Sequence, residues 1–117
     1  MPLIIIHRNP AVVCDARLVH IAEHLPEVVA AALSCDEGPV SAEDVSIEIS
    51  DVGAFDKNVR DLNIRVHAHY FAERAADLGM RQQRISRGIR ELFPECESWS
   101  VWVLLHKGSH GTSELVF

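Results

Sequence analysis

Hydrophobic and polar residues alternate in two stretches of the chain, which is the pattern of a strand with one buried face. Residues 45–50 read Val-Ser-Ile-Glu-Ile-Ser, and residues 62–70 repeat the alternation over nine positions. Two further runs, residues 3–6 and 98–105, are rich in Ile, Val and Trp and also predict strands. The sequence therefore predicts four strands.

Two stretches between these strands have the i, i+3, i+4 spacing of apolar residues that buries one stripe of a helix. The first covers residues 15–33, with Asp15 as the expected N-cap. Pro26 lies inside it and lacks a backbone donor, so we expect a bend or a restart there. The second covers residues 78–93 and is closed by Pro94.

The predicted order is strand, helix, strand, strand, helix, strand. A right-handed crossover in each half places both helices on one face of the sheet. The predicted fold class is therefore α/β (α+β): two βαβ halves giving a four-stranded mixed sheet with two helices on one face, in a single domain of residues 1–117. Polar side chains on the other face, such as Glu48, Arg65 and His67, favour contact with water or with another subunit.

Composition and charge exclude several classes of protein. The chain has 117 residues, 48% of them hydrophobic and 24% charged. This length and composition suffice for one hydrophobic core that needs no disulfides or bound metal to fold. Its apolar runs are far shorter than the roughly 20 residues of a bilayer span, and no secretory signal is evident, so we expect a cytoplasmic protein with no membrane partner. The net charge is −6, and residues 59–117 carry only 8 basic against 7 acidic side chains, so we expect no nucleic-acid partner.

Pro2 is the first candidate for chemistry. It follows the initiator Met, and removal of Met1 would leave a secondary amine at the start of a strand. A free α-amino group has a pKa of about 7.7–8, and partial burial or a nearby positive charge lowers it toward neutrality. An amine of that pKa suits proton transfer at neutral pH.

These features together resemble the tautomerase superfamily. The resemblance rests on Met1-Pro2 followed by an Ile-rich strand, two βαβ halves, a helix interrupted at Leu25-Pro26, an outward histidine at Val66-His67, and Arg81-Gln82-Gln83. Within the superfamily the chain is most similar to 5-carboxymethyl-2-hydroxymuconate isomerase. The resemblance covers most of residues 2–106.

The resemblance implies a cofactor-independent isomerase in aromatic catabolism that works as a homotrimer without a metal. Pro2 would move a proton between carbon and oxygen of a small enol or unsaturated carboxylic acid. Arg74 aligns near the arginine that binds the substrate carboxylate. The family also has an arginine at the start of the second strand, where this chain has Glu43 and Asp44, so Arg65, or else Arg8 or Arg60, would have to replace it.

Several other interpretations stay open at this stage. His67 and His69 have the spacing of a metal-binding pair, although hydrogen bonding across a subunit interface is the simpler expectation. The arginines from residue 74 to residue 90 are expected to lie on a solvated helix face. The three cysteines are expected to be reduced, mostly buried thiols rather than nucleophiles; they are Cys14, Cys35 and Cys96.

The main rival to an enzyme is a catalytically inert trimeric binding or scaffold protein on the same fold, because a fold does not by itself determine a function. Two tryptophans in the last predicted strand, Trp99 and Trp102, lie on opposite strand faces. One of them is expected in the core and the other at an interface.

Overall fold

The structure, a computed structural model, describes residues 2–57, 59–96 and 98–107, so that Met1 and residues 108–117 of the predicted domain lie outside the described residues. The elements in chain order are β1 (Leu3–Arg8), α1 (Asp15–Leu33), the 3-10 helix η1 (Ala42–Asp44), β2 (Ser46–Asp51), β3 (Leu62–His69), α2 (Ala72–Ala76), α3 (Leu78–Leu92) and β4 (Trp99–His106).

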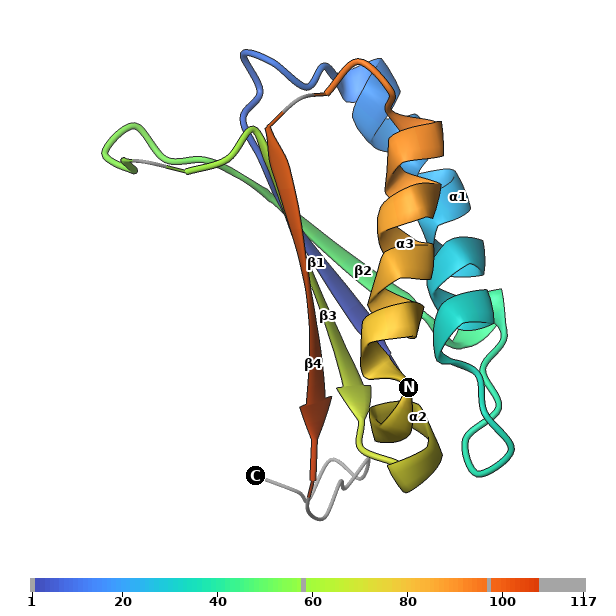
Figure 1. Cartoon of the computed structure of the whole chain (residues 1–117). Coiled ribbons are helices and arrows are strands. Elements are labelled where there is room, and N and C mark those ends of the chain that lie inside the picture. The colour runs from blue at the N-terminus through green and yellow to red at the C-terminus, as the bar shows by residue number, and fades with distance from the viewer. Residues whose placement is uncertain (1, 58, 97, 108–117) are drawn as a thin grey trace, which may run out of the picture.

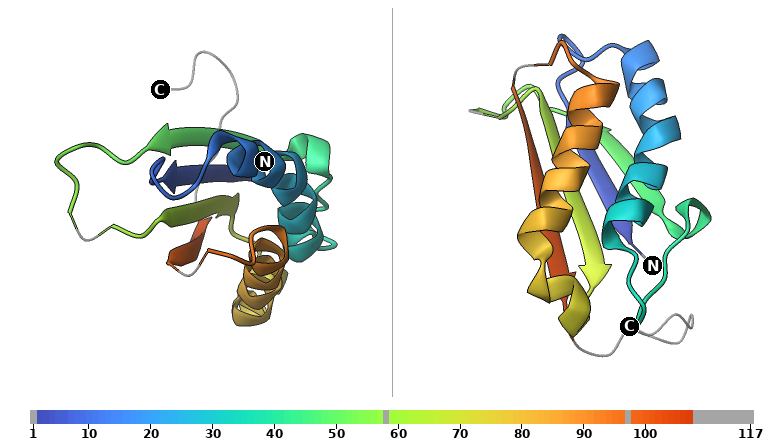
Figure 2. Two further views of the ribbon diagram at one scale, coloured as in Figure 1. Left: turned by 90° about the horizontal axis from the view of Figure 1, so that it is seen from above. Right: turned by 45° about the vertical axis from the view of Figure 1, so that its right-hand side comes forward.

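The strands form one mixed sheet in the order β2-β1-β3-β4. β1 runs parallel to β2 and antiparallel to β3, and β3 runs parallel to β4. Helices α1 and α3 lie side by side on one face of this sheet, as Figures 1 and 2 show. The predicted fold class, two βαβ halves with both helices on one face, is confirmed.

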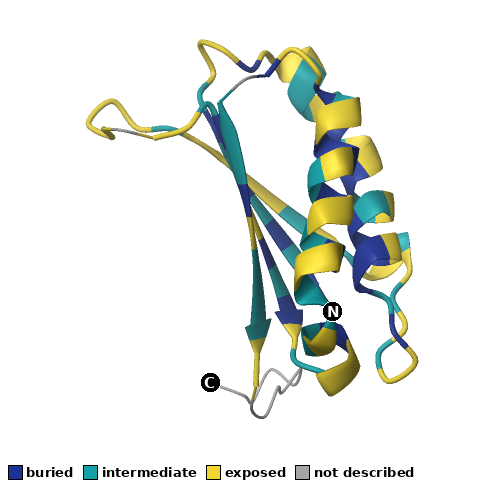
Figure 3. Ribbon diagram, in the orientation of Figure 1, coloured by how far each residue is buried: buried dark blue, intermediate teal, exposed yellow. Residues whose placement is uncertain are grey.

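The core lies between the two helices and one face of the sheet. Alternate residues of β1 and β3 are buried, which is the period-two pattern expected of strands covered on one side (Figure 3). Their apolar side chains meet the buried stripes of the helices, and each fully buried Ile or Leu contributes about 1.5–3 kcal/mol. The completely buried side chains include Ile4, Ile6, Ile21, Leu25, Ile64 and Ile85.

Helix α1 is continuous through Pro26, so the restart expected there is wrong. Leu25 and Val29, on either side of the proline, are both fully buried. Burial of these side chains holds both halves of the helix against the sheet and offsets the missing backbone hydrogen bond. The expected N-cap is also wrong by one residue: Cys14 occupies that position, and Asp15 is the first helical residue, where its carboxylate suits the helix dipole.

The two main helices lie close together at Gly88. A methyl group at this position would collide with the side chain of Val28 on α1. Gly88 is buried, although glycine is unfavourable in a helix interior by about 1 kcal/mol relative to alanine. The close helix contact explains why glycine occupies this position.

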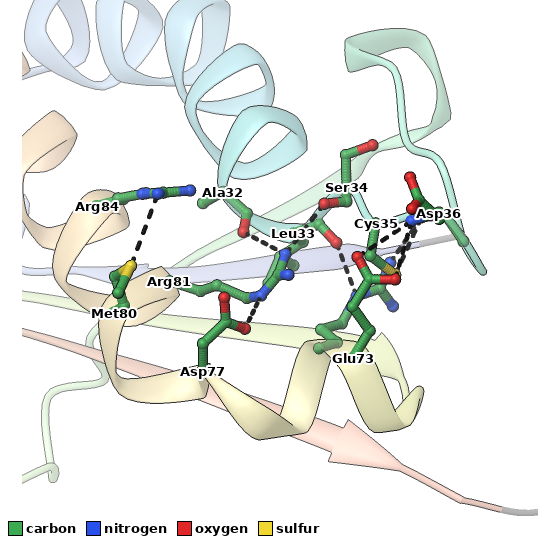
Figure 4. A network of polar contacts seen from close by, with 12 residues as sticks. Ala32, Leu33, Ser34, Cys35, Asp36, Glu73, Asp77, Met80, Arg81 and Arg84 are labelled. Carbon is green, nitrogen blue, oxygen red and sulfur yellow. Dashed lines mark hydrogen bonds and ion pairs between the residues drawn. The ribbon is translucent and has the colours of Figure 1, made fainter.

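The arginines of the second half do not all lie on a solvated face, which corrects the sequence-based expectation. Arg74 and Arg81 are buried, whereas Arg84, Arg87 and Arg90 are exposed. Figure 4 shows the polar network between the end of α1 and the start of α3. There, Arg81 donates to Asp77 Oδ1 at 2.6 Å and to two carbonyl oxygens at the end of α1 at 3.0 Å.

The short helix α2 was not predicted, because its five residues are too few to show a periodic pattern. One expectation about exposure is also corrected. The alternation of residues 45–50 gives Ile49 a buried face, but Ile49 is 42% exposed, because β2 lies at the edge of the sheet. Cys35 and Cys96 are buried and Cys14 is exposed, which agrees with the expectation of mostly buried thiols.

Within the described residues, both main helices lie on one face of the sheet and no helix covers the other face. Trp99 packs against the core, as expected for one of the two tryptophans, and Trp102 is 59% exposed on the other face, where the expected interface stays a prediction. Among the described residues, no helix is both long and apolar enough to cross a bilayer.

Candidate active site

Pro2 lies at the end of the sheet where four elements meet. β1 and β2 begin at this end, and β3 and β4 finish here, because β1 is parallel to β2 and antiparallel to β3. The loop after α1 and the short helix α2 lie at the same end (Figure 1). This convergence places side chains from distant parts of the sequence around the start of β1.

The backbone of Pro2 is fixed in the sheet. Pro2 is buried, and its carbonyl oxygen accepts a hydrogen bond from the backbone N–H of Ser46 at 3.0 Å. The register that pairs Leu3 with His67 brings Ala68 level with Pro2 on the other side. The proline is thus held between two neighbouring strands, in an interior strand of the sheet.

Arg74 lies at this same end but is engaged with the backbone. Its three guanidinium nitrogens donate to the carbonyl oxygens of Leu33, His69 and Gly38, at 2.8, 2.7 and 3.1 Å. The residue is only 2% exposed. Arg74 therefore ties together the end of α1, the end of β3 and the loop between α1 and η1.

The surroundings of Arg74 explain how a charge is accommodated there. The guanidinium carbon lies 5.0 Å from the centre of the Phe71 ring, a cation–π arrangement. Phe71 in turn packs against Gly38 so closely that a methyl group on Gly38 would collide with the ring. Glycine at this position allows its carbonyl oxygen to reach Arg74. A substrate carboxylate would have to displace this carbonyl to make a bidentate contact.

Arg65 is placed differently. It is exposed on the open face of the sheet and pairs in register with Ile5. It lines a small pocket of about 90 Å³ together with His7, Ser50 and Asn63. The pocket has room for a group of a few heavy atoms, since a water molecule occupies about 30 Å³ in the liquid.

Asn63, beside this pocket, has an unsatisfied polar atom. Its side-chain oxygen is buried, and it has no hydrogen-bond partner within the part of the chain that the structure describes. A buried acceptor without a partner is unfavourable by about 1–3 kcal/mol. Because this oxygen is not exposed, a bound molecule does not reach it; the pocket presents the exposed guanidinium of Arg65 and so suits a negatively charged group.

Pro2 and Arg65 are not brought together within one chain. Arg65 is level with Ile5, three residues along β1 from Pro2, which corresponds to about 10 Å at the usual rise of a strand. Of the two arginines named as alternatives, Arg8 lies at the opposite end of β1, where it is bound to Asp15 and Asp51 at 2.7 Å. Arg60 lies in the exposed segment before β3.

Asp44, just before β2, contributes a negative charge at the end of the sheet where Pro2 lies. Asp44 ends η1, and its carboxylate accepts hydrogen bonds from the backbone N–H and the hydroxyl of Ser41, both at 3.0 Å. The backbone and hydroxyl bonds of Ser41 lower the pKa of Asp44, so this carboxyl group is ionised at neutral pH. The sequence revealed the acidic residues, but not the capping arrangement that fixes this carboxylate.

The histidines of the open face contact one another. His67 Nδ1 and His106 Nε2 are 2.8 Å apart, and the two rings are stacked. Burial, together with the charges of His106 and Arg65, lowers the pKa of His67, so its ring is neutral at neutral pH. His69, the other member of the proposed metal pair, instead meets the edge of the Phe71 ring. The residues that the structure describes contain no cluster of three metal-ligating side chains.

Comparison with known proteins identifies the fold of this chain. No protein-family model matches the sequence, and no curated protein matches it. Among solved structures, a 5-carboxymethyl-2-hydroxymuconate delta-isomerase is similar at a TM-score of 0.63 and 12% identity, over 100% of this chain and 88% of that chain. A macrophage migration inhibitory factor-like protein from Entamoeba histolytica is similar at a TM-score of 0.61 and 10% identity, over 96% and 95%. The chain has the tautomerase superfamily fold.

The tautomerase fold explains the arrangement of the elements but leaves the activity to be argued from the site, since the identities are this low. A third similar structure, a fused 4-OT protein described as a symmetric trimer, has a TM-score of 0.64 and 8% identity, over 97% of this chain and 93% of that chain. That protein assembles through three units of the fold. The roles of Pro2, Arg74 and Arg65 in this chain stay predictions.

Proposed function

We propose that the protein is a cofactor-independent tautomerase or isomerase that acts on a small enol or unsaturated carboxylic acid. The observation that carries this proposal is the burial of Pro2 at the start of an interior strand, with its carbonyl hydrogen-bonded to Ser46. The tautomerase fold, which is shared with an isomerase of this chemical class, supports it.

Pro2 is the proton carrier in this proposal. Removal of Met1 leaves an imino nitrogen that precedes the hydrogen-bonded carbonyl and is thus held in one place by the sheet. The nitrogen carries a proton between two atoms of the substrate, so the substrate is isomerised and the enzyme is unchanged. An α-amino group can do this because its pKa, about 7.7–8 when free, lies near neutral pH.

Arg65 binds the substrate carboxylate in the proposed complex. Its exposure and the adjoining pocket of about 90 Å³ support this role, and a planar guanidinium fixes a carboxylate through two parallel hydrogen bonds. Because Pro2 and Arg65 are separated within one chain, the complete site combines Pro2 of one subunit with Arg65 of a neighbour. Within the described part of the chain both main helices lie on one face of the sheet, and the other face, which carries the exposed Arg65 and Trp102, supports assembly into a homotrimer.

Arg74 stabilises the fold, apart from any role in binding the substrate. Its replacement would remove three hydrogen bonds to carbonyl oxygens, although the Gly38 carbonyl also accepts from the backbone N–H of Cys35 at 3.3 Å; at about 1 kcal/mol for each bond the loss is about 3 kcal/mol. A lower rate in an Arg74 variant would therefore reflect altered folding as well as altered binding. Carboxylate binding by Arg74 stays a hypothesis, and it requires the Gly38 carbonyl to move away.

An inert trimeric binding or scaffold protein is the second candidate. The engagement of Arg74 by three carbonyl groups favours it, because the arginine to which the family resemblance assigns the substrate carboxylate already has all three guanidinium nitrogens bonded. If the protein is an isomerase, the amine of Pro2 speeds proton transfer in a substrate. If it is an inert scaffold, the amine has no such effect.

The test is the rate at which processed protein ketonises a small enol carboxylic acid. We expect Pro2→Ala to lower kcat/KM by about 10-fold to 1000-fold, the usual contribution of a positioned acid or base being 10²–10⁴-fold. His24→Gln, an exposed change on α1, is the control and is expected to leave the rate unchanged. Equal rates for Pro2→Ala and the unaltered protein would reject the proposal.

A further inference from the structure

The start of β2 runs directly beside the start of β1. The strands are parallel, Leu3 pairs with Ser46, and the N–H of Ser46 bonds to the carbonyl of Pro2. Val45 is extended, with φ −95° and ψ 122°, so the chain continues backward from Ser46 in step with β1. By this register Val45 is level with Pro2, and Asp44, the last residue of η1, comes just before Val45, near the backbone on the amino side of the Pro2 carbonyl, where the imino nitrogen is found.

The carboxylate of Asp44 is fixed and charged. Both hydrogen bonds from Ser41 end on the same oxygen, Oδ2, and so hold the side chain within η1. After these two bonds, the positive charge of the chain's amino terminus is a further cause that lowers the pKa of Asp44. Removal of Met1 would transfer that positive charge to the nitrogen of Pro2, inside the sheet.

Other charged groups at this end act on Pro2 in different ways. Arg74, from α2, carries the opposing positive charge, but three carbonyl oxygens lie against its guanidinium and offset part of its field. His67 is neutral because its pKa is lowered. His69, at the end of β3, is exposed, and Glu43 lies one residue further from the strand than Asp44.

We propose that Asp44 is the counter-ion of the Pro2 imino group and keeps it protonated, so that the site begins its cycle as a proton donor. This inference rests on the proposed role of Pro2 and makes it more specific. An opposite charge stabilises the charged form of an amine, and the coupling acts equally on both partners. Asp44 is a positioning residue here, since it acts through Pro2 and not on the substrate.

The inference specifies the substrate class. A protonated proline gives its hydrogen to an electron-rich carbon, so the N–H bond breaks and a C–H bond forms. The enol hydroxyl then releases its proton to the proline nitrogen, which restores the starting state. Conjugated enol acids fit this sequence, whereas a substrate that must first lose a hydrogen from carbon requires an uncharged amine.

The experiment is a titration of the Pro2 nitrogen by ¹⁵N NMR in proline-labelled protein. The protein is co-expressed with a methionine aminopeptidase, and intact mass confirms that Pro2 is the first residue. We expect Asp44→Asn to lower the pKa of Pro2 by about one unit, while the neighbouring change Glu43→Gln shifts it by much less. The difference should shrink in high salt, because the carboxylate is exposed.

Asparagine can still accept the backbone hydrogen bond of Ser41, so Asp44→Asn is expected to preserve η1, and its melting temperature checks this. An unchanged pKa of Pro2 in Asp44→Asn, or an equal shift in Glu43→Gln, would overturn the inference. A different result, full activity in Pro2→Ala, would reject the proposed function. Failure of the inference and failure of the proposed function are therefore distinguishable.

Discussion

At the scale of single residues, the same side-chain type serves different purposes in different surroundings. Arg74 has all three guanidinium nitrogens on backbone carbonyls, whereas Arg65 faces solvent beside a small pocket. Sequence could identify both as candidate substrate-binding arginines, but it could not show which one is buried. That difference depends on Gly38 and Phe71, which lie far apart in the chain and meet only in the folded structure.

The histidine pair of the open face makes stability depend on pH. An unfolded histidine takes up a proton with a pKa of about 6.5, whereas the pKa of folded His67 is lower. The unfolded state therefore binds more protons as the pH falls below about 6.5, and the free energy of unfolding decreases until the folded pKa is passed. Above about pH 6.5 this contribution is fully present.

Urea unfolding at about pH 7.5 and about pH 5.5 measures this effect. We expect His67→Gln to lose part of the decrease in stability between the two pH values, because glutamine does not titrate. His24→Gln, on the exposed side of α1, should keep it. The same pH dependence in all three proteins would show that His67 does not contribute.

At the scale of elements, the alternating and helical patterns predicted the four strands and two main helices because each has one buried face. The helix does not restart at Pro26 because burial of Leu25 and Val29, which depends on tertiary packing, outweighs a local backbone penalty. The helix α2 was missed because its position depends on Arg74 and Phe71 rather than on a repeating pattern. Local sequence is informative only where an element follows its own periodicity.

The contact between α1 and α3 gives a matched pair of glycine substitutions. Gly88→Ala should destabilise the protein by about 1–3 kcal/mol, because the added methyl group collides with Val28, whose branched side chain has few alternative rotamers. Gly79→Ala, in the same helix with open space around it, should be neutral or stabilise by up to about 1 kcal/mol. Chemical denaturation measures both, and an equal effect of the two changes would contradict the close helix contact.

At the scale of the whole molecule, the proposed site requires more than one copy of the chain. Pro2 and Arg65 are about 10 Å apart along the sheet, by the usual rise of a strand, and no helix of the described residues covers the face that carries Arg65. Sequence reasoning predicted an oligomer from the polar second face. It could not determine which residue of a neighbour would approach Pro2, because that depends on the geometry of assembly.

Mixing two inactive variants tests the shared site. In a mixed oligomer, a Pro2→Ala subunit supplies an intact Arg65 and an Arg65→Ala subunit supplies an intact Pro2, so some sites are complete. We expect each variant alone to be slow and co-refolded mixtures to recover a fraction of the activity. No recovery, in mixtures whose mass confirms mixed oligomers, would place both residues in the same subunit's site or exclude Arg65 from it.

The central claim is that a free imino nitrogen on Pro2 transfers the proton. The most direct measurement compares two preparations of the same chain, one that retains Met1 and one from which it has been removed, each identified by intact mass. Retained Met1 converts the Pro2 nitrogen to an amide, which cannot carry a proton at neutral pH. The account predicts that only the processed form ketonises an enol acid, and equal rates in both forms would contradict it.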